Sequence, residues 1–369
     1  MGATSRFAYI DSVRAVAAGL VVWQHTAEIC VRLAPQISNR WIGDVLESVD
    51  LGRIGVIIFF AISGYVIPSS LDPADPDAGR VFLIRRFFRL FPAYWLSIPL
   101  GLAALWWLYG HDFPLRDALL NFTMAPSLFG ATAVIGLYWT LAYELGFYAM
   151  CLVLWRLGLL ARPWTMLVLT HLMLACGALL LLAAIYSRRG EFGGWALACF
   201  FYGVMFTGAA WRQWRDGALT SPLQRLAGLA GLLIWLVGLP LGCIAVLVVS
   251  GKDLPFFVRT PSGYAGGLVI FLLLTTVARI NWRPVAWVGL VSYSLYLFHP
   301  VVLYPLQRLL QLWAPAHLDL ALMMAVEFIL AIALSAAVFY AVERPAIGLG
   351  RRLTHRNPRA PLLPSEEVI

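Results

Sequence analysis

Long apolar segments alternate with short polar connections along almost the whole chain. A membrane-spanning helix needs about 20 mainly apolar residues, because the hydrocarbon core of a bilayer is about 30 Å thick and a helix rises about 1.5 Å per residue. The pattern predicts an all-α membrane protein with about ten transmembrane helices in one bundle. The expected spans are 13–31, 54–70, 91–109, 136–157, 164–186, 194–210, 226–250, 262–278, 286–306 and 321–342.

Two regions outside these spans have a different composition. Residues 115–133 are only half apolar, which favours a re-entrant or interfacial segment. Residues 351–369 are rich in arginine and proline and contain no long apolar run, which predicts a disordered tail. We therefore expect one transmembrane domain over 1–350 and a disordered cytoplasmic tail over 351–369.

The basic residues predict the orientation of the bundle. With the N-terminus in the cytoplasm, the cytoplasmic segments hold 17 of the 27 basic residues and the opposite side holds nine, while Arg14 lies within the first span. Cytoplasmic loops of membrane proteins carry an excess of arginine and lysine. Both termini are therefore expected in the cytoplasm.

Composition narrows the range of partners. Hydrophobic residues make up 61% of the chain and charged residues 12%, whereas soluble domains have roughly 45–50% and about 25%. The net charge of +8 comes almost entirely from arginines, which stand at the ends of apolar segments. Nucleic-acid binding is not expected, because these arginines form no solvated patch with interleaved aromatics. The expected partners are the lipid bilayer and an anionic ligand.

The first span contains ionisable residues, which are costly in hydrocarbon and usually face a protein or water-filled interior. Arg14 and His25 are 11 residues apart, so they share one helix face and lie about 16 Å apart along the axis. Asp11 precedes Arg14 by three residues and can pair with it. An imidazole is well suited to take a hydroxyl proton near neutral pH. His25 is therefore a candidate general base, and a packed core histidine is the alternative.

Polar residues continue in and after the second span. Ser63 and Gly64 lie in its middle, where small residues allow close helix contact or leave room for a substrate. Arg85, Arg86 and Arg89 follow in an aromatic-rich segment, RVFLIRRFFRLF. Guanidinium groups match phosphate oxygens well, so this segment predicts a phosphate clamp. Anchoring to anionic lipid headgroups is the alternative.

Two later spans carry one ionisable residue each at an unusual place. Glu144 lies among aromatic residues that include Tyr148, and a carboxylate there needs a partner such as Arg14 or His25. A structural ion pair is the alternative. His299 precedes Pro300, which lacks an N–H group and is expected to kink the helix. The kink favours a polar pocket beside His299, and a residue at the membrane interface is the alternative.

These segments together resemble the acyltransferase-3 family of bacterial integral-membrane O-acyltransferases. The similarity lies in DSVRAVAAGLVVWQH, FFAISGYVI, RRFFRLFPAYWL, YWTLAYELGFY, SYSLYLFHP and VERP, over about residues 7–350. The resemblance implies about ten core helices, acyl-CoA bound from the cytoplasm as the donor, and a carbohydrate or glycolipid acceptor. It also implies a multi-pass protein of the inner (plasma) membrane. No permanently bound cofactor and no metal are expected.

The resemblance also implies roles for single residues. His25 matches the family's essential histidine, Arg14 its first-span arginine, and Glu144 the glutamate of a W-x-L-x-x-E-x-x-F-Y pattern. Arg86 and Arg89 match the arginine pair that follows the second span.

The expected activity is transfer of an acyl group, most simply acetyl, from acyl-CoA to a hydroxyl of an exported or cell-surface carbohydrate. Arg85, Arg86 and Arg89 would hold the CoA phosphates, Arg14 would orient the pantetheine arm, and Glu144 would set the tautomer of the base, His25. A covalent acyl-histidine relay is an alternative route. The remaining expected substrate or supporting residues are Asp11, Ser63, Tyr148 and His299.

A transporter or flippase for an anionic or glycan-lipid substrate is the rival function. Buried arginine, glutamate and histidine would then bind the substrate or coupling ions. The two halves of the chain show no inverted repeat, which disfavours this function.

Overall fold

The computed structural model describes residues 8–33, 40–187, 190–250, 255–313 and 320–355, and within these ranges it contains helices and no β-strand. The α-helices are α1 (Ala8–Leu33), α2 (Arg40–Ser48), α3 (Leu51–Val66), α4 (Ala78–Gly101), α5 (Leu115–Asn121), α6 (Trp139–Arg156), α7 (Pro163–Ser187), α8 (Gly190–Arg215), α9 (Pro222–Leu233), α10 (Leu239–Ser250), α11 (Pro255–Thr275), α12 (Arg283–Leu290), α13 (Ser292–Trp313), α14 (Leu320–Val338) and α15 (Arg344–Leu353). Short 3₁₀ turns are η1 (Pro68–Ser70), η3 (Trp107–Tyr109), η4 (Pro126–Phe129) and η5 (Gly136–Tyr138).

The helices account for the expected membrane spans. Among the described residues, seven helical stretches are long and apolar enough to cross a membrane, and the bent pair α12–α13 makes an eighth. The two other expected spans lie in α1 and α11, which are 26 and 21 residues long. A helical membrane protein is confirmed. The total of ten spans stays a prediction, as does the cytoplasmic side of the termini, since 1–7 and 356–369 lie outside the described residues.

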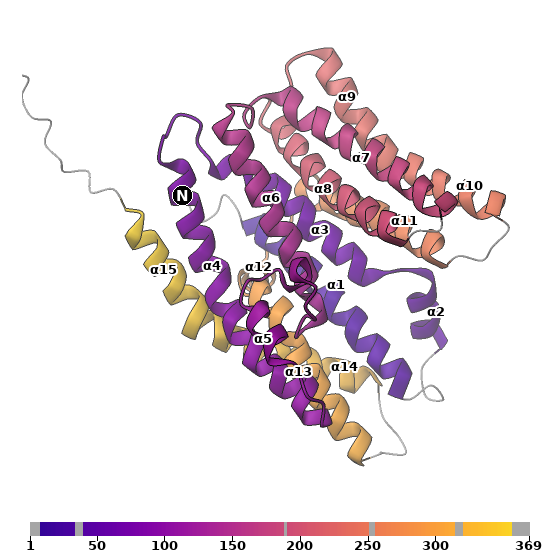
Figure 1. Cartoon of the computed structure of the whole chain (residues 1–369), viewed down its shortest axis with the longest axis vertical. Coiled ribbons are helices and arrows are strands. Elements are labelled where there is room, and N and C mark those ends of the chain that lie inside the picture. Colours follow the sequence, from indigo (N-terminus) through magenta and orange to yellow (C-terminus); the bar gives the residue numbers. More distant parts are fainter. Residues whose placement is uncertain (1–7, 34–39, 188–189, 251–254, 314–319, 356–369) are drawn as a thin grey trace, which may run out of the picture.

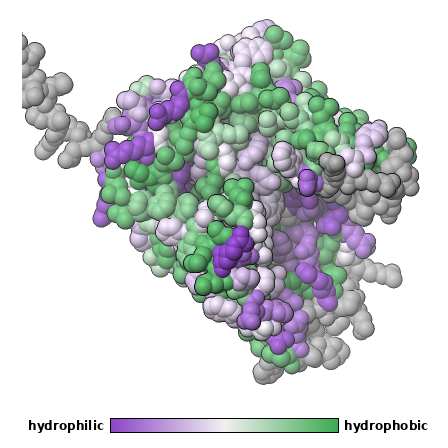
Figure 2. All heavy atoms as spheres, viewed as in Figure 1, coloured by the Kyte–Doolittle hydropathy of each residue, from purple (hydrophilic) through white to green (hydrophobic). Residues whose placement is uncertain are grey.

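Polar and apolar residues separate on the surface. In Figure 2, apolar residues cover much of the face in view, while hydrophilic residues gather at its upper left and lower right. The upper left carries α15 and the start of α4 in Figure 1. Large apolar side chains such as Leu179, Val248 and Ile329 are exposed on the helices. An exposed apolar area of this kind fits contact with lipid.

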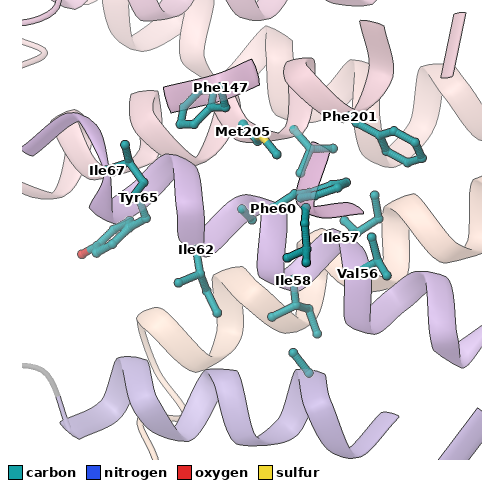
Figure 3. Close-up of a cluster of buried hydrophobic side chains, with 14 of the residues drawn as sticks. Val56, Ile57, Ile58, Phe60, Ile62, Tyr65, Ile67, Phe147, Phe201 and Met205 are labelled. Atoms are coloured by element: carbon teal, nitrogen blue, oxygen red, sulfur yellow. The ribbon is translucent and has the colours of Figure 1, made fainter. Parts of the chain in front are cut away.

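Helix α3 is the central element of the bundle. It packs against α1, α8 and α11, and ten of its 16 residues are buried. A mainly apolar helix can be surrounded by other helices in this way without burying unpaired charges. Figure 3 shows Ile57 and Phe60 of α3 together with Phe147 of α6 and Met205 of α8 in this core.

Two glycines bring helix backbones into direct contact. A Cβ atom on Gly64 of α3 would clash with the carbonyl of Met205 in α8, and one on Gly289 of α12 would clash with the carbonyl of Asp11 in α1. Only glycine permits such an approach. Gly64 therefore serves close helix contact, as one of its two interpretations predicted, and it also fixes the position of the neighbouring Ser63.

Three π-helical segments interrupt the long helices: η2 (Leu102–Trp106), η6 (Ile234–Gly238) and η7 (Phe339–Glu343). The last two end two residues before Pro240 and Pro345. A proline ring clashes with the carbonyl four residues earlier, and the wider π turn relieves that clash. As a result, η7 ends with Glu343 buried, where its carboxylate accepts a hydrogen bond from Ser294 at 2.9 Å.

Three local details differ from the expectations. The arginine segment 80–91 continues without a break into the expected span that follows it, within helix α4, and its aromatic side chains pack along that helix. Helix α13 continues through Pro300, and the 71° bend of this span lies between α12 and α13. Helix α15 runs to Leu353, beyond the domain boundary expected at residue 350, because it packs on α4. The rest of the expected tail, 356–369, lies outside the described residues.

Residues 115–133 fold into α5, η4 and connecting turns around one buried amide. The side-chain amide nitrogen of Asn121 donates to the carbonyl of Thr132 at 2.8 Å, and its oxygen accepts from the backbone N–H of Val134 at 2.9 Å. The hydroxyl of Tyr94 in α4 donates to the Asn121 carbonyl at 2.7 Å. The segment is thus tied to α4, and its re-entrant or interfacial position stays a prediction.

Candidate active site

A small cavity of about 90 Å³, here called the arginine cavity, lies between α1, α3, α4, α6 and α13. It brings together residues that are far apart in the sequence and that were predicted from four separate segments. Its polar lining consists of Arg14, Ser63, Arg86, Arg89, Thr140, Glu144, Ser292, Tyr293 and Tyr296.

Asp11 and Tyr148 do not line the cavity but hydrogen-bond to residues that do. The Arg14 guanidinium donates to the Asp11 carboxylate at 2.9 Å, which confirms the predicted pair. The Tyr148 hydroxyl donates to the Glu144 carboxylate at 2.5 Å. Arg86 lies 5.5 Å from the ring centroids of both Tyr148 and Phe82. These cation–π contacts hold the guanidinium without using its N–H donors, so the donors are free to bind an anion.

A neighbouring cavity of about 260 Å³, here called the outer basic cavity, shares Arg86 and Arg89 with the arginine cavity. Arg85 of α4 and Arg351 of α15 complete its basic lining, and no acidic side chain is among the described residues that line it. The three arginines predicted as a phosphate clamp therefore meet at one place. The sequence interpretation missed Arg351, because it assigned residue 351 to the disordered tail.

A larger cavity of about 870 Å³ adjoins the arginine cavity and is here called the aromatic cavity. His25 lines it, and Val56 and Tyr296 line both it and the arginine cavity. The Tyr296 hydroxyl is fixed by a hydrogen bond with Thr140 Oγ1 at 2.9 Å. The further polar and aromatic lining residues are Gln24, Glu28, Asp50, Arg53, Ser127, Trp139, Tyr143, Phe201 and Tyr202.

His299 is the partner of His25. The planes of the two rings differ by only 18°, with His25 Nδ1 at 3.1 Å from His299 Nε2, and His299 Nδ1 lies 3.1 Å from the Leu295 carbonyl. A carbonyl only accepts, so His299 Nδ1 carries a proton, and in the neutral ring Nε2 then accepts from His25 Nδ1. In neutral His25 this leaves the lone pair on Nε2. The chain of hydrogen bonds thus selects the tautomer that a general base needs.

The predicted pairing of Glu144 with His25 was wrong. The Glu144 carboxylate is bonded to Tyr148 and, at 3.4 Å, to Ser63 in the arginine cavity, whereas His25 is bonded to His299 on the opposite side of Val56 and Tyr296. Glu144 lies four residues before Tyr148, so the partner on its own helix was the nearest one available. Glu144 therefore belongs with the arginines and not with the base.

The helix face that Arg14 and His25 share borders two adjoining cavities and not one. Arg14 lines the arginine cavity and His25 the aromatic cavity, as expected for two residues on one helix face. Val56 and Tyr296 stand at the boundary. His299 is fully buried behind His25 and is not among the residues that line either cavity.

The sequence interpretation also missed the aromatic lining. Trp139 and Tyr143 are four residues apart on α6 and so share a helix face, which was the available signal. Glu28 and Gln24 have the same spacing on α1, and the Gln24 amide donates to Glu28 at 2.8 Å. In the part of the chain that the structure describes, no group of three His, Cys, Asp or Glu residues is arranged to hold a metal ion.

Comparison with known proteins identifies the family of this chain. The acyltransferase-3 family, described as an acyltransferase domain, matches residues 7–344. "Putative membrane-bound transacylase BcsY" of Komagataeibacter xylinus is 27% identical over 282 residues, which cover 67% of this chain and 65% of the relative. "Putative peptidoglycan O-acetyltransferase YrhL" of Bacillus subtilis is 27% identical over 305 residues, covering 68% and 44%. "Peptidoglycan O-acetyltransferase OatA" of Listeria monocytogenes is 25% identical over 328 residues, covering 76% and 49%.

The chain thus spans between 44% and 65% of the length of these three relatives. No solved structure matches it. The family match extends over nearly the whole described bundle and includes every residue of the two cavities that meet at Val56 and Tyr296. It confirms the resemblance drawn from the sequence motifs, and the chain belongs to the acyltransferase-3 family.

Proposed function

We propose that this protein is a membrane O-acyltransferase of the inner membrane, which transfers an acyl group, most simply acetyl, from acyl-CoA to a hydroxyl of an exported or cell-surface carbohydrate. One observation carries the proposal: a cavity lined by three arginines adjoins a large cavity that holds a histidine in the tautomer of a general base. The donor and the acceptor would therefore bind in separate cavities that adjoin within the bundle.

The donor fits the arginine side. Coenzyme A carries three phosphate groups, and guanidinium forks bind phosphate oxygens by charge-assisted hydrogen bonds. Arg85, Arg86 and Arg89 would hold these groups at the cytoplasmic face, with the pantetheine arm entering the arginine cavity beside Arg14. Glu144, tied to Tyr148, would fix the position of the helix segment that Arg86 packs on.

The acceptor fits the aromatic side. A sugar ring presents apolar C–H faces and a rim of hydroxyl groups, so it binds where aromatic faces and polar side chains alternate. Trp139 and Tyr143 supply aromatic faces in this cavity, while Glu28 and Asp50 supply hydrogen-bond acceptors. The volume of about 870 Å³ is large enough for a sugar unit and its neighbours in a chain.

Chemistry would take place at the boundary of the two cavities. The acceptor oxygen attacks the thioester carbonyl, a C–O bond forms, and the C–S bond breaks. His25 Nε2 takes the hydroxyl proton and returns it to the sulfur, so that CoA leaves as a thiol. His299 would stabilise the protonated His25 ring through its hydrogen bond at 3.1 Å. In the alternative relay, His25 carries the acyl group between the two substrates.

The experiment is an acceptor-dependent transfer assay with purified protein in nanodiscs. We expect ¹⁴C-acetyl-CoA to lose its label to a bacterial surface polysaccharide, with one free thiol released per label and release of the label by alkali, as for an ester. Folded protein that releases no acceptor-dependent thiol across a panel of such polysaccharides would contradict the proposal. Movement of a labelled glycan across vesicles by the same protein would instead support the transporter or flippase.

A further inference from the structure

The outer basic cavity extends the arginine side toward the surface. Arg86 and Arg89 line both this cavity and the arginine cavity, whereas Arg85 and Arg351 line only the outer one. Arg85 and Arg351 are both exposed, while Arg86 and Arg89 are half-buried. The four guanidinium groups thus form two pairs, one at the junction of the cavities and one farther out.

Helix α15 is held firmly against α4 at this place. The Arg85 Nε group donates to Thr354 Oγ1 at 2.9 Å, and the same hydroxyl donates to the carbonyl of Gly350 at 2.9 Å. A Cβ atom on Gly350 would lie 2.9 Å from the Cβ of Phe88, so the two helices pack closely beside Arg351. The hydrogen bond uses only Nε of Arg85 and leaves its two terminal nitrogens as donors.

Coenzyme A has phosphate groups at two separate places. The pyrophosphate joins the adenosine to the pantetheine arm, and the 3′-phosphate projects from the ribose, farther from the thiol. With the thiol directed through the arginine cavity toward His25, the pyrophosphate lies at the junction pair and the 3′-phosphate lies farther out. A 3′-phosphate is a dianion, and two guanidinium groups without a carboxylate among the described lining would match its charge.

We infer that Arg351 of α15, together with Arg85, forms a binding site for the 3′-phosphate of the CoA donor, while Arg86 and Arg89 bind the pyrophosphate. This inference rests on the proposed acyl-CoA donor. It gives the C-terminal helix a function in donor selection. A pantetheine thioester that lacks a 3′-phosphate would lose the outer contacts and bind more weakly.

The test compares two ligands and two neighbouring arginines. Affinities for acetyl-CoA and for 3′-dephospho-acetyl-CoA are measured on full-length protein in nanodiscs of phosphatidylcholine, which carry no anionic lipid. Arg351→Gln is the test variant, and Arg352→Gln is its matched control, since Arg352 is exposed on the same helix but does not line the cavity. We expect Arg351→Gln to weaken acetyl-CoA binding about tenfold and to leave dephospho-acetyl-CoA binding unchanged.

The outcomes separate the inference from the function on which it rests. Two outcomes would overturn the inference alone, with acetyl-CoA still binding to the wild-type protein. In one, Arg351→Gln and Arg352→Gln change the affinity for acetyl-CoA equally. In the other, Arg351→Gln weakens the binding of acetyl-CoA and of dephospho-acetyl-CoA by the same factor. Absence of acetyl-CoA binding by folded wild-type protein would overturn the donor and the inference together. If Arg351→Gln has no effect in these nanodiscs and an effect only after anionic lipid is added to them, the site binds a lipid headgroup phosphate and the inference is also overturned.

Discussion

The arginine cavity and the aromatic cavity share four helices but differ in size and chemistry. α1 supplies Arg14 to one and His25 to the other, while α3, α6 and α13 also line both. The first cavity measures about 90 Å³ and is rich in guanidinium groups, and the second measures about 870 Å³ and is lined by aromatic rings. A narrow cationic site fits one fixed donor that carries phosphate groups, whereas a wide aromatic site accommodates acceptors of varied shape.

Under the proposed function, this contrast means that one set of helices would carry two specificities, one for the donor and one for the acceptor. Changes on the arginine side are expected to alter donor affinity alone, and changes on the aromatic side are expected to alter acceptor affinity alone. Changes at His25 and His299 are expected to alter turnover. Kinetic constants measured separately for donor and acceptor therefore test the division.

His25→Ala should have the largest effect, a loss of about 10³-fold in turnover, because removal of the general base leaves no acceptor for the hydroxyl proton. Membrane abundance should stay at the wild-type level. His171→Ala is the control, since His171 is bonded to the Leu167 carbonyl of its own helix and lies outside both cavities. Turnover near that of wild type in His25→Ala would require another base.

Reversing the charges of Arg86 and Arg89 to glutamate should weaken acetyl-CoA binding about 100-fold, because two attractive phosphate contacts become repulsive. The wild-type affinity should fall with increasing salt. Arg80→Glu provides the control on the same helix, because Arg80 is exposed and lines neither basic cavity. Unchanged donor affinity with a lower membrane level would assign Arg86 and Arg89 to lipid anchoring.

His299→Leu should reduce kcat by roughly 30-fold, because His25 Nδ1 then loses its acceptor and the tautomer with a free Nε2 is no longer favoured. KM for both substrates should stay near wild type, and the pH dependence of kcat should change. His299→Gln places a carbonyl oxygen at a similar position and should recover part of the activity. Equal losses and an unchanged pH profile in the two variants would leave His299 with a packing role only.

Trp139→Ala should have the smallest effect, an increase of about fivefold in KM for the carbohydrate with no change for acetyl-CoA, because one aromatic face is lost. Trp164→Ala on α7 is the control, since that indole is exposed and lines neither cavity. A weaker affinity for acetyl-CoA in Trp139→Ala would show that the donor extends into the aromatic cavity.

The sequence predicts those features of the two cavities that depend on residues close together in the chain. Helical periodicity alone places Arg14 and His25 on one face and predicts the Asp11–Arg14 pair, both of which the structure contains. The motifs identify the family. Long apolar segments identify the helices, because each must satisfy its own backbone hydrogen bonds in lipid.

The remaining features depend on contacts between distant segments. His25 and His299 are 274 residues apart, and nothing in either local sequence selects that partner over Glu144. Arg351 lies in a polar, arginine-rich stretch whose composition resembles a tail, and its helix is ordered by packing of Gly350 against Phe88. Composition therefore predicts disorder for a segment that forms a helix, because this helix is stabilised by packing against a neighbouring helix.

The boundary formed by Val56 and Tyr296 has an electrical consequence. An acetyl group is uncharged, so its passage across this boundary is independent of the membrane potential, whereas a proton or ion gains or loses about 2.3 kcal/mol per 100 mV. The hydroxyl proton taken by His25 returns to the sulfur, so the proposed reaction moves no net charge. With an apolar valine and a hydrogen-bonded tyrosine between the cavities, the proposed transfer would carry a two-carbon group across the bundle without an ion crossing with it.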